Sequence, residues 1–151
     1  MTNLFSYHST FNADISSWDV SSVTNMTEMF RETPFNQDIS NWNTSNVTAM
    51  NNLFMSCPAF NQPIGSWDTS SVLTTALMFA GAQQFNQDIS SWDVSNVIDM
   101  TAMFQLSGFN QPLDNWDVSN VTDIKVMFYV SPFNQDLNSW NVSNVTNMNR
   151  M

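Results

Sequence analysis

Hydrophobic positions recur along the chain in one repeating pattern. In the first full copy they are Ile15, Trp18, Val20, Val23, Met26, Met29 and Phe30. The offsets of three and two from Ile15 to Val20 place side chains on one face of an extended segment, which predicts a short strand. The offsets of three, three and one from Val23 to Phe30 form the stripe of a short helix of about two turns. Each copy is therefore predicted to fold as a strand followed by a short helix.

This pattern belongs to a longer repeated phrase, Phe-Asn-Gln-Asp-Ile-Ser-x-Trp-Asp-Val-Ser-Asn-Val. The phrase recurs six times with small changes, starting at Phe11, Phe35, Phe60, Phe85, Phe109 and Phe133. Spacings of 24 or 25 residues indicate one supersecondary unit used repeatedly, in a single array over 1–151 with a partial copy at 1–10. Neither end carries an atypical polar copy, so we expect a fragment of a longer array or a unit whose ends meet another chain.

Polar residues predict where each helix begins and ends. The residue before each predicted helix accepts hydrogen bonds readily, as expected of a helix cap: it is Ser22, Asn46, Ser71, Asn96, Asn120 or Asn144. The segment after each helix varies in length and carries Pro, Gly or Ser, which predicts an outer loop.

Short strands and two-turn helices are marginal alone, so we expect successive copies to stack as coils. The strands would then pair as a parallel sheet with a spacing of about 4.8 Å. One column of like residues would contain Trp18, Trp42, Trp67, Trp92, Trp116 and Trp140. A second, satisfying backbone groups of the turns, would contain Asn12, Asn36, Asn61, Asn86, Asn110 and Asn134.

The phrases Phe-Asn-Gln-Asp-Ile-Ser-x-Trp-Asp-Val-Ser-Asn-Val and Asn-Met-Thr-x-Met-Phe resemble the BspA-like repeat of bacterial and mycoplasma surface proteins, over the whole chain. The unit length and strand-then-helix order also look like a leucine-rich repeat. The resemblance implies a right-handed, leucine-rich-repeat-like α/β solenoid of about six coils with a parallel sheet, and a β-solenoid is the alternative. It also implies display on a cell surface and adhesion, with no catalytic residues and no cofactor.

Charge excludes some classes of partner. Thirteen acidic residues oppose three basic ones, for a net charge of -10. Such a surface repels nucleic acid, and no apolar run is long enough for membrane insertion. His8 and Cys57 each occur once in the variable segments, so neither completes a metal set or a nucleophile–base pair, and both are predicted to be exposed. We therefore expect a protein that is not an enzyme.

Acidic residues form two further columns. One contains Asp19, Asn43, Asp68, Asp93, Asp117 and Asn141, and the other contains Asp14, Asp38, Pro63, Asp88, Pro112 and Asp136. The exchange of Asp with Asn favours a role as hydrogen-bond acceptors in turns. Calcium held between coils by Asp68, Asp93 and Asp117 is the alternative, because calcium prefers carboxylate and carbonyl oxygens.

The leading hypothesis for function is a non-enzymatic, extracellular module that binds a protein or glycan on a surface. Its interface is expected among the residues that do not repeat, namely Tyr7, His8, Arg31, Glu32, Gln83, Gln84, Lys125 and Tyr129. The second hypothesis is end-to-end self-assembly into a homo-oligomer through uncapped ends, with calcium as a further stabiliser.

Overall fold

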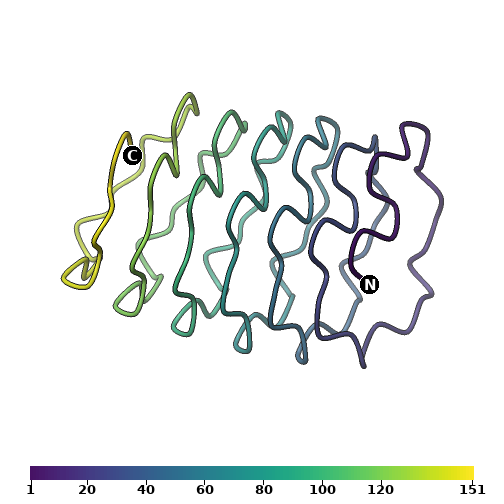
Figure 1. The fold of residues 1–151 in the computed structure, drawn as a ribbon, viewed down its shortest axis with the longest axis horizontal. Coiled ribbons are helices and arrows are strands. Elements are labelled where there is room, and N and C mark those ends of the chain that lie inside the picture. Colours follow the sequence, from purple (N-terminus) through teal and green to yellow (C-terminus); the bar gives the residue numbers. More distant parts are fainter.

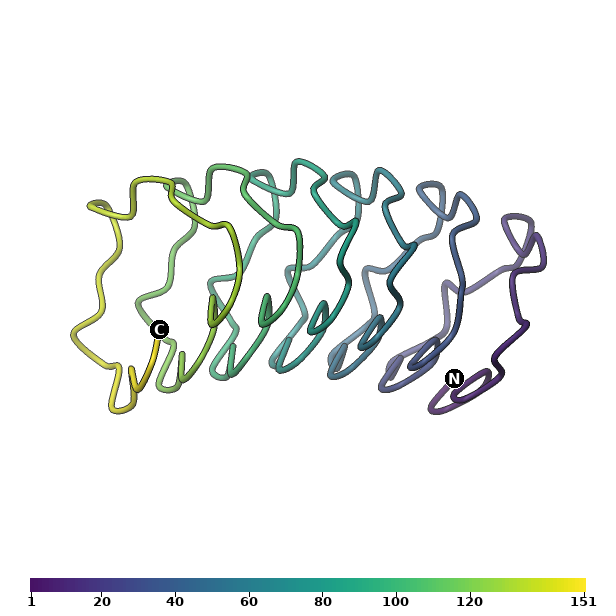
Figure 2. The same cartoon turned by 90° about the horizontal axis from the view of Figure 1, so that it is seen from above.

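The computed structural model describes all 151 residues as a stack of coils, one coil for each sequence repeat. Figure 1 shows the coils side by side along the long axis, with the two termini at opposite ends of the stack. The view from above in Figure 2 shows successive coils following nearly the same path. Residues 24 or 25 positions apart therefore lie in neighbouring coils.

The stack contains no helix and no strand of regular length. Ordered β-structure is limited to isolated parallel bridges, which join Asn25 to Ala49, Ala49 to Thr74, Thr74 to Asp99, Asp99 to Asp123, and Asp123 to Asn147. The predicted α/β solenoid with a parallel sheet is therefore wrong. The leucine-rich-repeat character and the alternative β-solenoid are wrong for the same reason, because each requires strands that the chain does not form.

The segment predicted as a helix is a run of tight turns. The N–H of Met29 bonds the carbonyl of Met26, that of Arg31 bonds Glu28, and that of Thr33 bonds Phe30. Between these donors, alternate N–H groups point along the stack: Met26, Glu28, Phe30 and Glu32 donate to Ala49, Asn51, Leu53 and Met55 of the next coil. A helix would use those donors within its own segment. The apolar spacing survives because the turns bury Met26, Met29 and Phe30 completely.

Left-handed backbone makes this run of turns possible. Glu28 and Glu32 have φ of 57°, and two equivalent positions in each complete coil share this conformation. Positive φ at the third residue of the Met26–Met29 turn is the signature of a type II turn. Such turns direct the intervening N–H groups toward the neighbouring coil.

The segment predicted as a strand also consists of turns. The N–H of Trp18 bonds the carbonyl of Ile15, and the N–H of Val23 bonds that of Val20. The apolar residues at offsets of three thus open and close turns, while Ile15 and Val20 still point inward.

The residues predicted to cap helices instead join coils. The side-chain amide of Asn46 donates to the carbonyl of Ser21 (2.8 Å), and Asn96 donates to Ser70 (2.8 Å). Ser71 does the same with its hydroxyl to Ser45 (2.9 Å). With no helix to cap, these side chains satisfy carbonyl groups of the coil before them.

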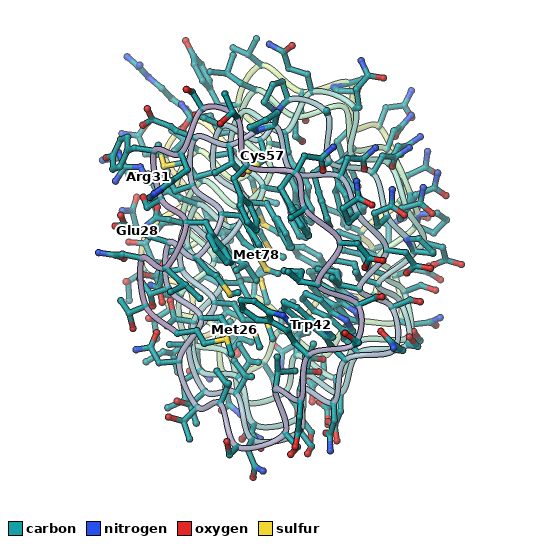
Figure 3. The ribbon with its side chains drawn as sticks, turned by 90° about the vertical axis from the view of Figure 1, so that its right-hand side faces the viewer. Met26, Glu28, Arg31, Trp42, Cys57 and Met78 are labelled. Carbon is teal, nitrogen blue, oxygen red and sulfur yellow. The ribbon has the colours of Figure 1, made fainter.

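Stacked phenylalanine rings fill the interior. One column runs through Phe30, Phe54, Phe79, Phe104 and Phe128, with ring centroids 5.5 to 5.7 Å apart. A second column runs beside it, and within each coil the two rings stack closely, as with Phe54 and Phe60 at 3.7 Å. Figure 3 looks along the stack and shows Met26, Met78, Cys57 and Trp42 inside the coils. Each buried ring contributes roughly 2–3 kcal/mol of burial free energy, which no coil obtains alone.

Candidate functional site

Aspartate side chains organise the exposed turns. Asp14 precedes the Ile15–Trp18 turn and accepts a hydrogen bond from the N–H of Ser16 (2.9 Å). Asp19 precedes the Val20–Val23 turn and accepts from the N–H of Ser21 (2.9 Å). Asn25 stands in the same relation to Thr27 (2.8 Å). An Asp or Asn thus stabilises three successive turns of this coil, which is why the two residue types exchange between copies.

The three residues considered as calcium ligands have this turn-forming geometry. Asp68 accepts from both the N–H and the hydroxyl of Ser70 (3.0 and 2.6 Å), and Asp93 is held identically by Ser95. Asp117 accepts from the N–H of Ser119 (3.0 Å). No three His, Cys, Asp or Glu side chains are grouped in a way that could hold an ion. The structure places the three carboxylates one per coil, each engaged with its own turn.

The same hydrogen bonds change the acidity of these groups. The hydroxyl and N–H of Ser70 lower the pKa of Asp68, and those of Ser119 lower the pKa of Asp117. For Asp14 the larger cause of the lowered pKa is the N–H of Ser16. At Asp38 the nearby charge of Asp14 opposes the lowering, so neighbouring carboxylates repel weakly along their column. These shifts reflect stabilised turns and do not mark a proton-transfer site.

The tryptophan residues lie in register along the stack. The rings of Trp42 and Trp67 are 6.4 Å apart and nearly parallel, as are those of Trp92 and Trp116 at 6.5 Å. Each indole after the first donates to an Ile or Leu carbonyl of the preceding coil, at 2.9 to 3.3 Å. These residues hold neighbouring coils together, and only Trp18 is exposed, at 38 %.

The asparagine column forms a second axial ladder. The side-chain oxygen of Asn36 accepts the N–H of Asn61 (2.9 Å), and the relation continues to Asn134. Glutamine side chains add further hydrogen bonds between the same coils. The amide of Gln62 donates to both the carbonyl and the side-chain oxygen of Asn36 (2.9 and 2.8 Å). Both columns thus fix the register on which the outer turns rest.

The structure brings three of the predicted partner-binding residues together. The guanidinium of Arg31 lies 5.0 Å from the centre of the Tyr7 ring, and its Nε lies 3.4 Å from Glu32. Glu28, which sequence reasoning missed, lies 3.2 Å from the same guanidinium. Figure 3 shows Arg31 and Glu28 on the outside of the coils. These four side chains form a charged cluster at the N-terminal part of the stack.

The remaining predicted residues are spread along the stack. His8 is exposed on a turn, with its Nδ1 3.1 Å from the carbonyl oxygen of Ser6. Gln83, Gln84 and Lys125 are exposed in later coils, and Tyr129 is 40 % exposed. They do not converge on a single pocket.

Sequence reasoning missed two exposed apolar residues beside Tyr129. Leu106 is 51 % exposed and Val130 is 63 % exposed. Both break the expectation that apolar residues of the repeat face inward, and this mismatch with the periodic stripe was the available signal. Leu73 and Ile98, 48 % and 51 % exposed, are similar exceptions elsewhere on the stack.

Cys57 is not the exposed loop residue that its position predicts. Its side chain is fully buried, and its thiol donates to the carbonyl of Phe30 (2.7 Å). Burial raises the pKa of the thiol to about 11, against a smaller lowering by hydrogen bonds with Thr33. The equivalent residues Thr33, Ala82 and Ser107 are buried too, so this place in the variable segment belongs to the core.

One shallow cavity opens on the outer turns. It has a volume of about 240 Å³ and is lined by Ser9, Glu32, Thr33, Pro34, Ser56 and Pro58. Its one ionisable side chain is Glu32, which also belongs to the charged cluster. The structure contains no helix with the length and apolarity that crossing a membrane requires.

Two overlapping parts of the chain match one known protein family. Residues 1–86 and 62–151 each match a family described as "Mycoplasma protein of unknown function, DUF285". The chain belongs to this family. The predicted membership of the BspA-like surface-repeat family is therefore wrong, and the DUF285 description carries no statement of adhesion. No curated protein and no solved structure matches the chain.

Proposed function

We propose that this DUF285 chain is a non-enzymatic binding module. Its stacked interior positions a row of variable turns along the side of the molecule, and these turns contact a macromolecular partner. The proposal depends on a difference between the repeating and the non-repeating residues. The repeating aromatic and asparagine side chains are used in contacts between coils, while most of the predicted partner-binding residues lie exposed along the stack; Arg31 is half-buried, and the non-repeating Cys57 is in the core. Solenoids bind large partners through such extended surfaces by summing many modest contacts.

The chemistry of the surface supports binding over catalysis. The shifted acids are explained by turn formation, and the buried thiol has a raised pKa that disfavours the nucleophilic thiolate. The one cavity has a single ionisable side chain, so it lacks the acid–base pairs that hydrolytic chemistry uses. That the chain is not an enzyme stays a prediction, as does its location on a cell surface.

The experiment compares the intact chain with a variant in which the eight predicted residues are replaced by the residues of other copies. These are Tyr7, His8, Arg31, Glu32, Gln83, Gln84, Lys125 and Tyr129. Quantitative crosslinking in extracts of a mycoplasma and of its host cells should give partners that only the intact chain captures. Equal capture by both, with equal melting temperatures, would reject the proposal.

End-to-end assembly is the second candidate. The first coil exposes Trp18, and the last exposes Val142 and Met148. Backbone donors in the turn segment point from each coil toward the next, so the two ends present complementary groups. Sedimentation across a wide dilution series separates the candidates, since growth with concentration supports assembly and a constant monomer mass excludes it.

A further inference from the structure

A row of left-handed residues runs along the outer turns of the stack. It consists of one residue per coil, namely Tyr7, Glu32, Ser56, Gly81, Leu106 and Val130, with φ between 55° and 74°. The first five donate their N–H groups to the next coil, as Leu106 does to the carbonyl of Tyr129 (3.0 Å). We name this row the left-handed ridge. Its backbone is set by the repeat, but its side chains are free to vary.

Leu106 and Val130 are unexpected at these positions. Positive φ suits glycine and asparagine, and is a genuine outlier for a branched or bulky residue such as valine. Gly81 occupies the same place in the third repeat at no steric cost. The leucine and valine side chains are more than half exposed, so core packing does not compensate for their strain. The left-handed backbone itself is held by the repeat, as by the N–H of Leu106 on the carbonyl of Tyr129 in the next coil, so the feature that points outside the chain is the exposure of apolar side chains at these positions.

The two residues form one apolar patch with Tyr129. Leu106 and Val130 occupy equivalent positions in adjacent coils, and Tyr129 precedes Val130 and is itself 40 % exposed. The nearest neighbours in the chain, Gln105, Ser107 and Ser131, carry no charge. Contiguous exposed apolar side chains on a soluble stack mark interaction surfaces.

The other end of the ridge is acidic. Glu32 lines the 240 Å³ cavity, and Arg31 is shared between Glu28 and Glu32, so the charged cluster keeps one net negative charge. The whole chain carries a net charge of -10, which attracts a cationic partner over long range and repels a second copy of the chain. The ridge thus joins an apolar end to an acidic end.

We propose that the left-handed ridge binds an extended, cationic segment of a partner protein. Apolar side chains of this segment contact Leu106, Tyr129 and Val130, and one of its basic side chains contacts Glu32. Glu32 and Leu106 are three coils apart, which is roughly 14 Å at the usual spacing between stacked backbone segments. An extended peptide covers that distance in about four to five residues. The basic and apolar residues of the partner should therefore be separated by about four residues. This inference rests on the proposed binding function and names the partner's chemistry.

The probe is a fluorescein-labelled synthetic peptide with two lysines and two leucines separated by four serine and glycine residues, synthesised in both orders. Fluorescence anisotropy with the full chain should show binding that weakens as salt is raised. The double variant Leu106→Asn, Val130→Asn should lose at least tenfold in affinity. Its melting temperature should be unchanged or higher, because asparagine tolerates positive φ, so loss of folding does not explain the loss of binding.

Two matched variants complete the test. Leu73→Thr removes an exposed apolar side chain outside the ridge, where other copies carry Thr, and should leave the affinity unchanged. Glu32→Gln should weaken the lysine peptide several-fold without affecting a version in which serine replaces lysine. Equal binding by the double variant overturns the proposal. So does a dimer of the intact chain that the double variant abolishes, since that identifies a second copy as the occupant.

The peptide experiment can reject the ridge proposal without rejecting the proposed binding function. Suppose the peptide fails to bind while the eight-residue replacement still removes specific crosslinking. The ridge proposal then falls and the binding function stands. If both experiments fail, the binding function itself is rejected.

Discussion

The indole Nε1 of Trp67 donates a hydrogen bond of 3.0 Å to the carbonyl oxygen of Ile39, which lies in the preceding coil. Trp67 is 3 % exposed, so neither group has water as an alternative partner. The relation recurs along the stack and makes each coil dependent on the one before it.

Replacing Trp67 with Phe should therefore destabilise the stack by about 2–3 kcal/mol, from the lost indole hydrogen bond and a partly empty space, although the Ile39 carbonyl keeps its bond from the N–H of Trp42. Trp18→Phe is the matched control, because Trp18 is 38 % exposed and the chain supplies no earlier Ile carbonyl for its indole. Its effect should stay below about 1 kcal/mol. Denaturant unfolding followed by circular dichroism measures both, and equal effects would show that the axial bond contributes nothing.

Thr75 should be a position where substitution stabilises the protein. Its hydroxyl is buried without a hydrogen-bond partner, in a column that holds Met26, Met50 and Met100 in other coils. Thr75→Val removes the unpaired hydroxyl at nearly constant volume and should raise the free energy of unfolding by about 1 kcal/mol. Thr75→Ser keeps the hydroxyl, loses a methyl group and should lower stability. A loss of stability in the Val variant would indicate that the hydroxyl is satisfied in solution.

Stability should fall in acid. Bonds from Ser16, Ser70 and Ser119 hold the pKa of Asp14, Asp68 and Asp117 below the ordinary value of about 3.9. A carboxyl whose pKa is lowered by folding stabilises the fold fully above its unfolded pKa and loses that contribution as pH falls through the folded value. The melting temperature should thus be flat above about pH 5 and decline below about pH 4. Replacing several of these residues with Asn, which keeps the acceptor, should flatten the decline, and an unchanged profile would contradict the assignment.

Cys57 should be unreactive in the folded protein. Burial and a thiol pKa of about 11 leave little thiolate at pH 8. Ellman's reagent should therefore label Cys57 slowly in buffer and completely in denaturant. A cysteine introduced at the exposed Ser9 is the positive control and should react at once. Rapid native labelling of Cys57 would place the thiol outside the core.

Calcium should leave the melting temperature unchanged. Asp68 and Asp93 each use a carboxylate oxygen for two hydrogen bonds within their own turns, and no three acidic side chains converge. Thermal melts in excess calcium and in chelator provide the comparison. A rise with calcium that chelator reverses would support the ion-binding alternative.

The sequence predicted burial well and backbone conformation poorly. Met26, Met29 and Phe30 are buried as their spacing indicates, yet the spacing arises from consecutive turns and not from a helix. The deciding feature is positive φ at positions held by Glu28, Leu77 and Val126, and none of these residues signals a left-handed backbone. Contacts with the neighbouring coil override the local preference.

For the candidate surface too, the sequence predicts some features and not others. Exchange of Asp with Asn indicated turn-forming acceptors, and Asp68 and Asn43 both accept the N–H two residues ahead. Leu106 and Val130 lie in the variable segments, where the polar residues predict outer loops and partner contacts. Their mismatch with the periodic apolar stripe is the available signal, whereas the outward direction of the turns depends on contacts between coils.

The axial hydrogen bonds also determine how the molecule bears load. At least five backbone bonds join each interior pair of neighbouring coils, and the coils follow one another along the long axis. Tension applied at the two termini passes through every interface in series, so the weakest one opens first and releases one coil of 24 or 25 residues. The protein should thus extend under force in steps of nearly uniform length, with one coil released in each step.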